Sequence, residues 1–256
     1  MNQHTISDQV VIVTGGARGL GRRISEAFLR EGARVAVNYL ASRDPAEDLA
    51  AAHPGRAVAL QGDVRSRADM DRVVADAAEA FGAPVTTVVN NALVNFSFDG
   101  DARPTAGEIT YRRFAEQFEG SVGGALNTVQ AALGDFDRAG YGRVVNIGTN
   151  LFQNPLVPYH DYTAAKAALL SLTRSLAKDL GPRGVTVNMI SGGLLRTTDA
   201  SAATPEAVFD AIAASTPLGS AITPEELADA VLLFASPWSR SVTGQNLVVD
   251  GGLVMD

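Results

Sequence analysis

Two side chains in the segment DYTAAK, Tyr162 and Lys166, have the types and the spacing to move a proton. Residues four positions apart on a helix lie on one face, close enough to share a ligand. A phenol has an ordinary pKa of about 10 and is a weak acid at neutral pH unless a nearby cation favours its phenolate. Because Lys166 can be that cation, the pair predicts a general acid; the alternative is an ordinary surface pair.

A glycine turn near the amino terminus predicts a binding site for a dinucleotide. The apolar run at residues 10–13 predicts a strand buried on both faces, and helical spacing follows the turn TGGARGLG. In such a unit the small residues admit a pyrophosphate, and the free N–H groups of the helix bind it; the alternative is a plain tight turn. The turn residues expected to contact the cofactor are Gly15, Arg18, Gly19, Leu20 and Gly21.

The residue that ends the second predicted strand, Asn38, selects the cofactor. A site that prefers NAD usually has Asp or Glu there, which binds the ribose hydroxyls and repels a 2′-phosphate. This chain instead has Asn38 followed by Tyr39 and Ser42, with Arg18 and Arg43 as cations for the phosphate. The sequence therefore predicts NADP(H) over NAD, unless both arginines are only solvated surface groups.

Polar residues also end three other predicted strands, at the edge of the sheet where ligands bind in open α/β folds. Asp63, followed by Val64, ends the third strand, where it can accept a hydrogen bond from an adenine amino group or cap a loop. Asn90 and Ala92 follow the fourth strand, where the backbone passes the cofactor. Thr149 ends the fifth strand, so its hydroxyl is expected at the same edge.

Two polar segments are predicted to shape the mouth of a substrate site. Residues 94–107 form a loop after the fourth strand. Residues 191–216 form a lid-like excursion after a sixth strand that ends at Ile190. The small residues at 120–125 permit close helix packing or an oligomer contact.

Composition predicts one domain, residues 1–256, that acts without metal, membrane or nucleic acid. The chain is 46% hydrophobic and long enough to bury a full core. It has no cysteine, and its three histidines lie far apart in the sequence, which argues against a metal site. A formal charge of -7 disfavours binding to nucleic acid. Because the chain has neither a signal-peptide pattern nor a long apolar run, we expect a cytoplasmic protein.

Four motifs, in their order and spacing, resemble those of the short-chain dehydrogenase/reductase family over nearly the whole chain. They are TGGARGLG at 14–21, NNA at 90–92, YxxxK at 162–166 and VTGQNLVVDGG at 242–252. Within the family the chain is most similar to β-ketoacyl-acyl-carrier-protein reductases, through NY after the second strand, TPL near Thr216, PEELADAV and the carboxyl tail. Sugar and steroid dehydrogenases share these features.

The resemblance implies a Rossmann-type α/β domain: a doubly wound, seven-stranded parallel sheet in the order 3-2-1-4-5-6-7, with helices on both faces. It implies a homotetramer or homodimer and NADPH-dependent reduction of a ketone. The implied substrate is a 3-oxoacyl-[acyl-carrier-protein] or related 3-oxoacyl thioester, as in fatty acid biosynthesis. The alternatives are another small alcohol or ketone, such as a sugar, steroid or xenobiotic, and a dinucleotide-binding regulatory protein without catalysis. Arg112 and Arg113 are candidate cations for an acidic carrier protein, or a solvated helix face.

By the same resemblance, Tyr162 donates a proton, Thr149 holds the substrate oxygen, and Lys166 binds the nicotinamide ribose and lowers the phenol pKa. Thr149 stands where the family has a serine, and Ser121 stands where it has the helix asparagine of a proton relay. Leu93 replaces the glycine that follows NNA in the family. The resemblance implies two further cofactor contacts after the sixth strand, Gly193 and Thr197.

Overall fold

The computed structural model describes residues 4–196 and 198–255, in which seven strands form one parallel sheet. The strand order β3-β2-β1-β4-β5-β6-β7 confirms the expected topology. The strands are β1 Val10–Val13, β2 Arg34–Tyr39, β3 Ala57–Gln61, β4 Thr87–Asn90, β5 Gly142–Thr149, β6 Val185–Gly192 and β7 Asn246–Val249. The chain begins in the middle of the sheet, runs outward to β3, and returns to β4. The order therefore reverses between β1 and β4, where open α/β sheets bind ligands outside the carboxyl ends of the strands.

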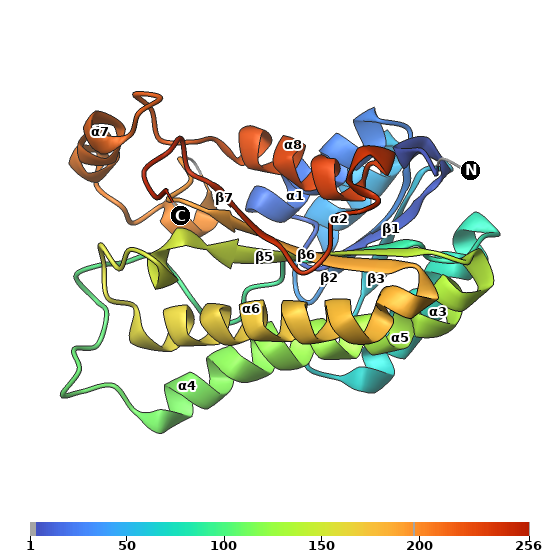
Figure 1. Ribbon diagram of the computed structural model, residues 1–256, viewed down its shortest axis with the longest axis horizontal. Coiled ribbons are helices and arrows are strands. Elements are labelled where there is room, and N and C mark those ends of the chain that lie inside the picture. Colours follow the sequence, from blue (N-terminus) through green and yellow to red (C-terminus); the bar gives the residue numbers. More distant parts are fainter. Residues whose placement is uncertain (1–3, 197, 256) are drawn as a thin grey trace.

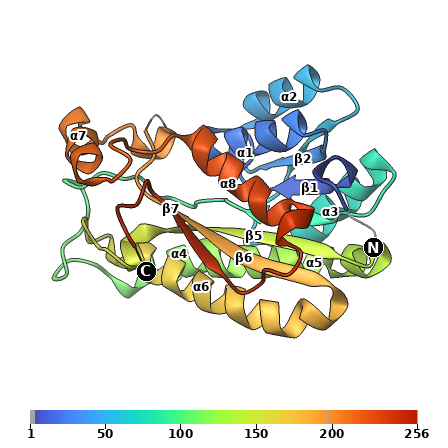
Figure 2. The same cartoon turned by 45° about the horizontal axis from the view of Figure 1, so that its top comes forward.

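Helices cover both faces of the sheet (Figures 1 and 2). The helices are α1 Gly19–Arg30, α2 Arg43–Ala52, α3 Arg67–Phe81, α4 Tyr111–Phe118, α5 Gly124–Ala139, α6 His160–Leu180, α7 Glu206–Ser215 and α8 Pro224–Ala235. In Figure 1, α1, α2 and α8 lie above the sheet, and α3, α5 and α6 lie below it. The loop before α4, the helix α7 and the carboxyl-terminal tail gather at the end to which the strands point.

The first strand shows why the sheet needs both layers of helices. Val11 and Val13 pack into a core formed with α1, α2 and α8, whereas Val10 and Ile12 pack into a second core formed with α3 and α5. Successive side chains of a strand point to opposite faces, so a continuous apolar run is buried only when both faces are covered. All four side chains are fully buried.

Among the strands that extend further than the sequence predicts, the second and the sixth change the interpretation of the sheet edge. The second strand includes Tyr39, one residue beyond the predicted end. The sixth includes Ser191 and Gly192, and Gly192 is still in register with Thr149 of β5 and Val249 of β7. The prediction that the excursion begins at Ser191 is therefore wrong, because pairing on both sides holds these residues in the sheet.

Two of the small residues between α4 and α5 serve contacts within the chain. Residues Glu119–Gly123 form a π-helical segment that joins the two helices. A Cβ atom added to Gly120 would lie 2.8 Å from a methyl of Val94, and one added to Gly124 would lie 2.9 Å from a methyl of Val64. The glycines therefore let two loops of the sheet edge approach this helix. Within the described residues, no helix combines the length and the apolar character that a membrane span requires.

Candidate active site

The predicted acid and its cation lie on the buried face of α6. Tyr162 and Lys166 are 5% and 3% exposed. The Lys166 ammonium lies 5.8 Å from the centroid of the Tyr162 ring, and it donates a hydrogen bond to the carbonyl of Ile147 at 2.8 Å. The Thr149 side chain, at the end of β5, makes a hydrogen-bonding interaction with the phenol. Sequence and structure thus agree on one group of three side chains, although their catalytic roles stay predictions.

Burial moves the pKa values of the two groups in opposite directions. It raises the pKa of the Tyr162 phenol well above its usual range, which the hydrogen bond with Thr149 only partly offsets. It lowers the pKa of Lys166 to about 8. Burial disfavours the charged form of either group, so the phenol holds its proton firmly. Burial is the largest influence on the phenol pKa in this structure, and the lowering of that pKa by Lys166 stays a prediction.

Aromatic side chains of the loop after β4 cover the phenol. The ring of Phe96 stacks on the ring of Tyr162, with centroids 4.4 Å apart and planes 17° from parallel. Phe98 meets the same ring edge-on at 5.4 Å, and Tyr159 meets both phenylalanines edge-on. The sequence placed both phenylalanines in a loop at the substrate mouth but missed their contact with Tyr162, since loop sequences lack periodicity.

The same loop is tied to the lid-like segment through the backbone of Phe98. Its N–H donates to the carbonyl of Ala200 at 2.9 Å, and its carbonyl accepts from the Thr204 hydroxyl at 3.2 Å. Two segments that lie about a hundred positions apart in the chain are therefore joined at this point. The two segments predicted to form the substrate mouth do meet in space.

The glycine turn has the shape of a cradle for a pyrophosphate. Gly15 and Gly19 adopt positive φ angles of 62° and 50°, and a Cβ added to Gly21 would lie 2.1 Å from the carbonyl oxygen of Gly15. Only glycine fits such positions. The first helix starts next to the turn with Arg18 as its N-cap, which makes no side-chain capping hydrogen bond. Leu20 is part of the first helical turn. These features fit a dinucleotide, whose phosphates bind helix N–H groups.

Hydrogen bonds join this turn to the NNA motif after β4. The Thr14 hydroxyl accepts the backbone N–H groups of Asn91 and Ala92 at 2.9 and 3.0 Å. The Asn91 amide donates to the carbonyl of Thr14 at 2.9 Å, and the Asn90 amide donates to the Asn146 side chain at 2.8 Å. The two predicted cofactor motifs therefore form one connected edge.

The residue that ends β2 is not the one that the sequence predicts. Asn38 is 1% exposed, and its amide donates to the carbonyls of Leu60 and Gly62 at 3.3 and 3.1 Å. The interpretation that the Asn38 side chain faces the cofactor ribose is therefore wrong, because its amide forms hydrogen bonds that join β2 to the end of β3. The strand ends at Tyr39, which is 5% exposed and stands where the cofactor-selecting residue was expected.

Two further residues that were predicted to contact the cofactor, Ser42 and Arg43, lie at the start of α2. Ser42 is the N-cap of α2 without a side-chain capping bond. Arg43 is exposed and lies 3.6 Å from Glu47.

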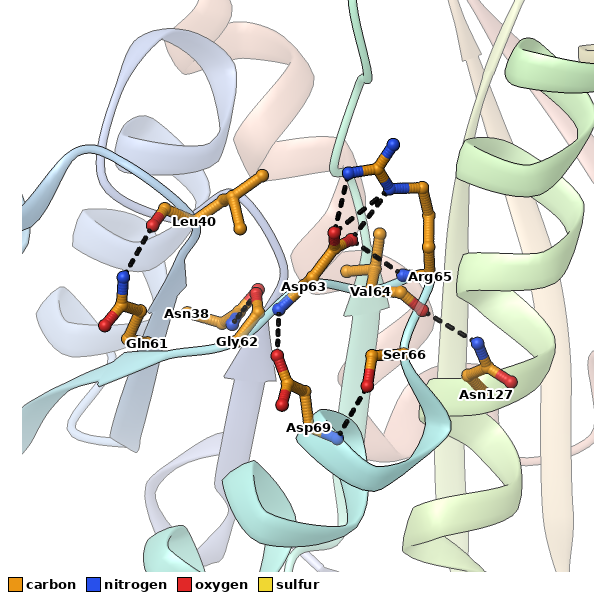
Figure 3. Close-up of polar contacts among 10 residues, drawn as sticks. All are labelled: Asn38, Leu40, Gln61, Gly62, Asp63, Val64, Arg65, Ser66, Asp69 and Asn127. Atoms are coloured by element: carbon orange, nitrogen blue, oxygen red, sulfur yellow. Dashed lines mark hydrogen bonds and ion pairs between the residues drawn. The ribbon is translucent and has the colours of Figure 1, made fainter.

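Asp63 lies at the end of β3, but its carboxylate is engaged by a neighbouring cation (Figure 3). The Arg65 guanidinium donates to both carboxylate oxygens, with a closest distance of 2.6 Å, and holds the pKa of Asp63 below its usual value. The carbonyl of Val64 accepts the Asn127 amide at 2.9 Å. A carboxylate has further acceptor positions, so an adenine contact by Asp63 stays a prediction.

Ser121 lies beside a small cavity. It is 6% exposed, and the cavity of about 10 Å³ is lined by residues that include Ser121, Asn90, Lys166 and Thr14. The Asn90 side-chain oxygen is buried, and no hydrogen-bond partner for it is found in the described part of the chain. A cavity of this size holds about one water molecule. Ser121 and Lys166 therefore line the same cavity, and the role of Ser121 in a proton relay stays a prediction.

Gly193 follows β6 and packs against the carboxyl-terminal tail. A Cβ added there would lie 3.0 Å from the Cβ of Asp250, whose carboxylate accepts the Asn150 amide at 2.8 Å. Thr197, the other predicted contact, lies outside the described residues. Its neighbour Thr198 approaches the glycine turn, since a Cβ added to Gly19 would lie 3.8 Å from that of Thr198. The lid-like segment therefore lies over the predicted phosphate cradle.

Comparisons with known proteins agree with this arrangement. A family model described as Enoyl-(Acyl carrier protein) reductase matches residues 15–254. A short-chain type dehydrogenase/reductase of Picea abies is 31% identical over 97% of this chain and 93% of its own. A 3-oxoacyl-[acyl-carrier-protein] reductase of Synechocystis is 30% identical, with 98% of both chains covered. The solved structure of a Serratia marcescens short-chain dehydrogenase/reductase mutant superposes with a TM-score of 0.83 at 30% identity, covering 98% of this chain and 99% of that one.

Proposed function

The chain belongs to the short-chain dehydrogenase/reductase family, and from that membership we propose that it reduces a ketone to a secondary alcohol with NADPH. It is an NAD(P)-dependent oxidoreductase of an alcohol or ketone. The observation that carries the proposal is the buried group on α6 and β5, in which Lys166 lies 5.8 Å from the Tyr162 ring and Thr149 interacts with the phenol. A protein that only bound a dinucleotide would not need this group.

The chain's own residues supply the proton and hold the oxygen that receives it. NADPH, when bound, supplies a hydride to the carbonyl carbon. Tyr162 gives its proton to the carbonyl oxygen. The Thr149 oxygen accepts the N–H of Leu151 at 3.3 Å, and its hydroxyl, which interacts with the phenol, donates to the substrate oxygen once a substrate is bound. The Lys166 ammonium donates one hydrogen bond to the carbonyl of Ile147, and its other N–H groups are left to donate to the nicotinamide ribose.

The preference for NADPH rests on the end of β2. Tyr39 is the last residue of the strand and Leu40 follows it, so no carboxylate stands there to repel a 2′-phosphate. Arg18, in the glycine turn, is the cation proposed to bind that phosphate, since guanidinium matches phosphate geometry. Replacement of Arg18 by alanine should therefore lower kcat/KM for NADPH more than for NADH.

The proposed substrate is a 3-oxoacyl thioester. The similarity to the Synechocystis reductase and the PEELADAV and tail motifs support it. The two arginines considered for carrier docking are engaged in the structure: Arg112 lies 3.2 Å from Glu116, and Arg113 lies 3.2 Å from the buried Asp161. Arg113 is therefore not a free cation on a docking surface. The proposal rests on recognition of the acyl group rather than on docking of a carrier protein.

A direct assay tests this function. Purified protein, NADPH and an acetoacetyl thioester should give a steady loss of the reduced cofactor's absorbance, and the Tyr162→Phe variant should not. A panel of other small ketones, run in parallel, identifies a different substrate if the thioester is inert. Failure to turn over any ketone, in a protein that binds NADPH, would favour the regulatory alternative.

A further inference from the structure

A pocket of about 250 Å³ lies beside the predicted acid, between the loop after β4 and the start of α6. Its wall includes Phe96 of the loop, and Tyr159 and His160 of the segment that enters α6. Phe96 also stacks on Tyr162 at 4.4 Å, so the pocket and the phenol share one aromatic ring. Pockets for drug-sized ligands measure about 300–1,000 Å³. This pocket therefore suits a small group attached to a substrate rather than a long acyl chain.

The two carboxylates that line the pocket are already engaged within the chain. Asp99 accepts the backbone N–H groups of Asp101 and Ala102 at 3.1 and 3.0 Å. Asp161, whose side chain is 4% exposed, accepts the N–H of Tyr162 at 3.0 Å and the Arg113 guanidinium at 3.2 Å. Asp161 is paired with Arg113, whereas Asp99 keeps its negative charge, because backbone N–H groups are neutral; among the described residues neither carboxylate forms an ion pair with Arg103.

The cations of the pocket have donors to spare. Arg103 lines the pocket and is half-buried, and among the described side chains no carboxylate forms an ion pair with it. Arg113 lines the same pocket and contacts Asp161 through Nε, which leaves its terminal nitrogens for another acceptor. A guanidinium carries five N–H donors in a planar fork that matches carboxylate and phosphate oxygens. The pocket therefore presents guanidinium N–H donors that no carboxylate of the described residues occupies, beside the carboxylates of Asp99 and Asp161.

We infer that this pocket is a second subsite of the substrate and binds a negatively charged oxygen group, a carboxylate or a phosphate, attached to the ketone. The inference rests on the proposed function and names the substrate class of the same site. Arg103 supplies the charge, Arg113 supplies further donors, and Phe96 and Tyr159 form the aromatic part of the pocket wall. A local cation is needed in a chain with a formal charge of -7, which otherwise repels anions.

The first experiment compares a short oxo acid with its methyl ester, which share the carbonyl and differ in charge. In the parent protein, kcat/KM with NADPH should be higher for the acid. In Arg103→Gln the acid-to-ester ratio should fall about tenfold or more, the scale of a charged hydrogen bond. Arg103→Lys should recover part of the ratio, because it restores the charge without the planar fork.

A neighbouring arginine provides the matched control. Arg112 is highly exposed, pairs with Glu116 and does not line the pocket. Arg112→Gln removes the same charge a short distance away, so it should leave the acid-to-ester ratio unchanged. A fall in the ratio equal to that of Arg103→Gln would show a general field effect and overturn the subsite.

A second pair of substrates separates the two sources of the anion. A 3-oxoacyl coenzyme A thioester carries phosphates, and the N-acetylcysteamine thioester of the same acyl group carries none. If Arg103→Gln penalises only the coenzyme A thioester, the pocket binds the phosphate of a carrier. If it penalises only the oxo acid, the pocket binds a carboxylate on the ketone.

The outcomes that overturn the subsite differ from those that overturn the proposed function. A protein that reduces neutral ketones, with the same charged-to-neutral ratio in parent and Arg103→Gln, keeps its function and refutes the subsite. A protein that reduces no ketone refutes the function, and the subsite is then judged by binding. In that case a small oxo acid should raise the Tm of the parent and not of Arg103→Gln, and equal shifts would refute the subsite.

Discussion

The half of the site that faces the cofactor and the half that faces the substrate are built in different ways. The cofactor half joins its strands through hydrogen bonds between polar side chains and backbone groups, as where the Thr14 hydroxyl accepts the N–H groups of Asn91 and Ala92. The substrate half is held by rings, as where Phe96 stacks on Tyr162. The hydrogen bonds of the cofactor half fix the path of the backbone, whereas the ring packing of the substrate half fixes the positions of particular side chains. We therefore expect substitutions to alter the substrate half more selectively.

The largest effect is expected from Tyr162→Phe. This change removes one hydroxyl and should lower kcat by about 10³-fold, within the range for loss of a general acid. The ring that packs against Phe96 remains, so the Kd for NADPH should stay within about twofold of the parent, a free-energy change well below one hydrogen bond. Steady-state kinetics and cofactor titration measure the two quantities. A variant that retained most of its kcat would show that the proton comes from another group.

A smaller loss is expected at Thr149. Thr149→Val keeps the shape but removes the hydroxyl, and should lower kcat by about 10²-fold, as when one donor to a reacting oxygen is lost. Thr149→Ser keeps the hydroxyl and should remain active. If a folded valine variant binds NADPH and turns over at nearly the parent rate, Thr149 only ends the strand.

Two adjacent substitutions at the end of β2 distinguish a cofactor contact from a structural one. Tyr39→Asp places a carboxylate at the strand end, so the ratio of kcat/KM for NADPH to NADH should fall about tenfold through repulsion of the 2′-phosphate. Asn38→Asp instead removes the donor to the carbonyls of Leu60 and Gly62, and should lower the free energy of unfolding by about 1–3 kcal/mol. If Asn38→Asp changed the cofactor ratio and Tyr39→Asp changed only the stability, Asn38 would be the residue that selects the cofactor.

Removal of the ring that covers the phenol should shift its titration. Phe96→Ala exposes Tyr162, and because burial is the main cause of the raised pKa, that pKa should fall towards about 10. The chain has five tyrosines, so the ultraviolet titration of Phe96→Ala must be compared with that of Phe96→Ala/Tyr162→Phe. An unchanged pKa would mean that the phenol is buried by other groups.

A pH-dependent change in stability is expected at Lys166. Burial lowers its pKa from 10.5 to about 8, so between these values the unfolded state binds more protons. The resulting cost to folding, at most about 3 kcal/mol, is full below about pH 8 and fades as the pH rises towards 10.5. The difference in unfolding free energy between Lys166→Met and the parent should therefore shift in favour of the parent between pH 7 and 10. A constant difference would place the ammonium in a solvated environment.

The sequence located most strands and helices but misplaced some of their ends. The end of β2 shows why one residue matters. Side chains alternate between the two faces of a sheet, so an extension of β2 by one residue changes both the residue that ends the strand and the face to which it points. Local patterns carry no sharp signal for that last residue, because pairing with β3 decides it.

By itself, the sequence determined the strand–turn–helix unit at residues 10–30 and the helical spacing of Tyr162 and Lys166. Both are local: glycines with positive φ and an apolar run set the first, and the pitch of a helix sets the second. Only the tertiary structure decided that Phe96 covers the phenol, that Phe98 hydrogen-bonds to Ala200, and that Arg103 lines a pocket. These contacts join segments far apart in the chain and lie in loops without periodicity, so their partners exist only once the sheet has brought the carboxyl ends of its strands together.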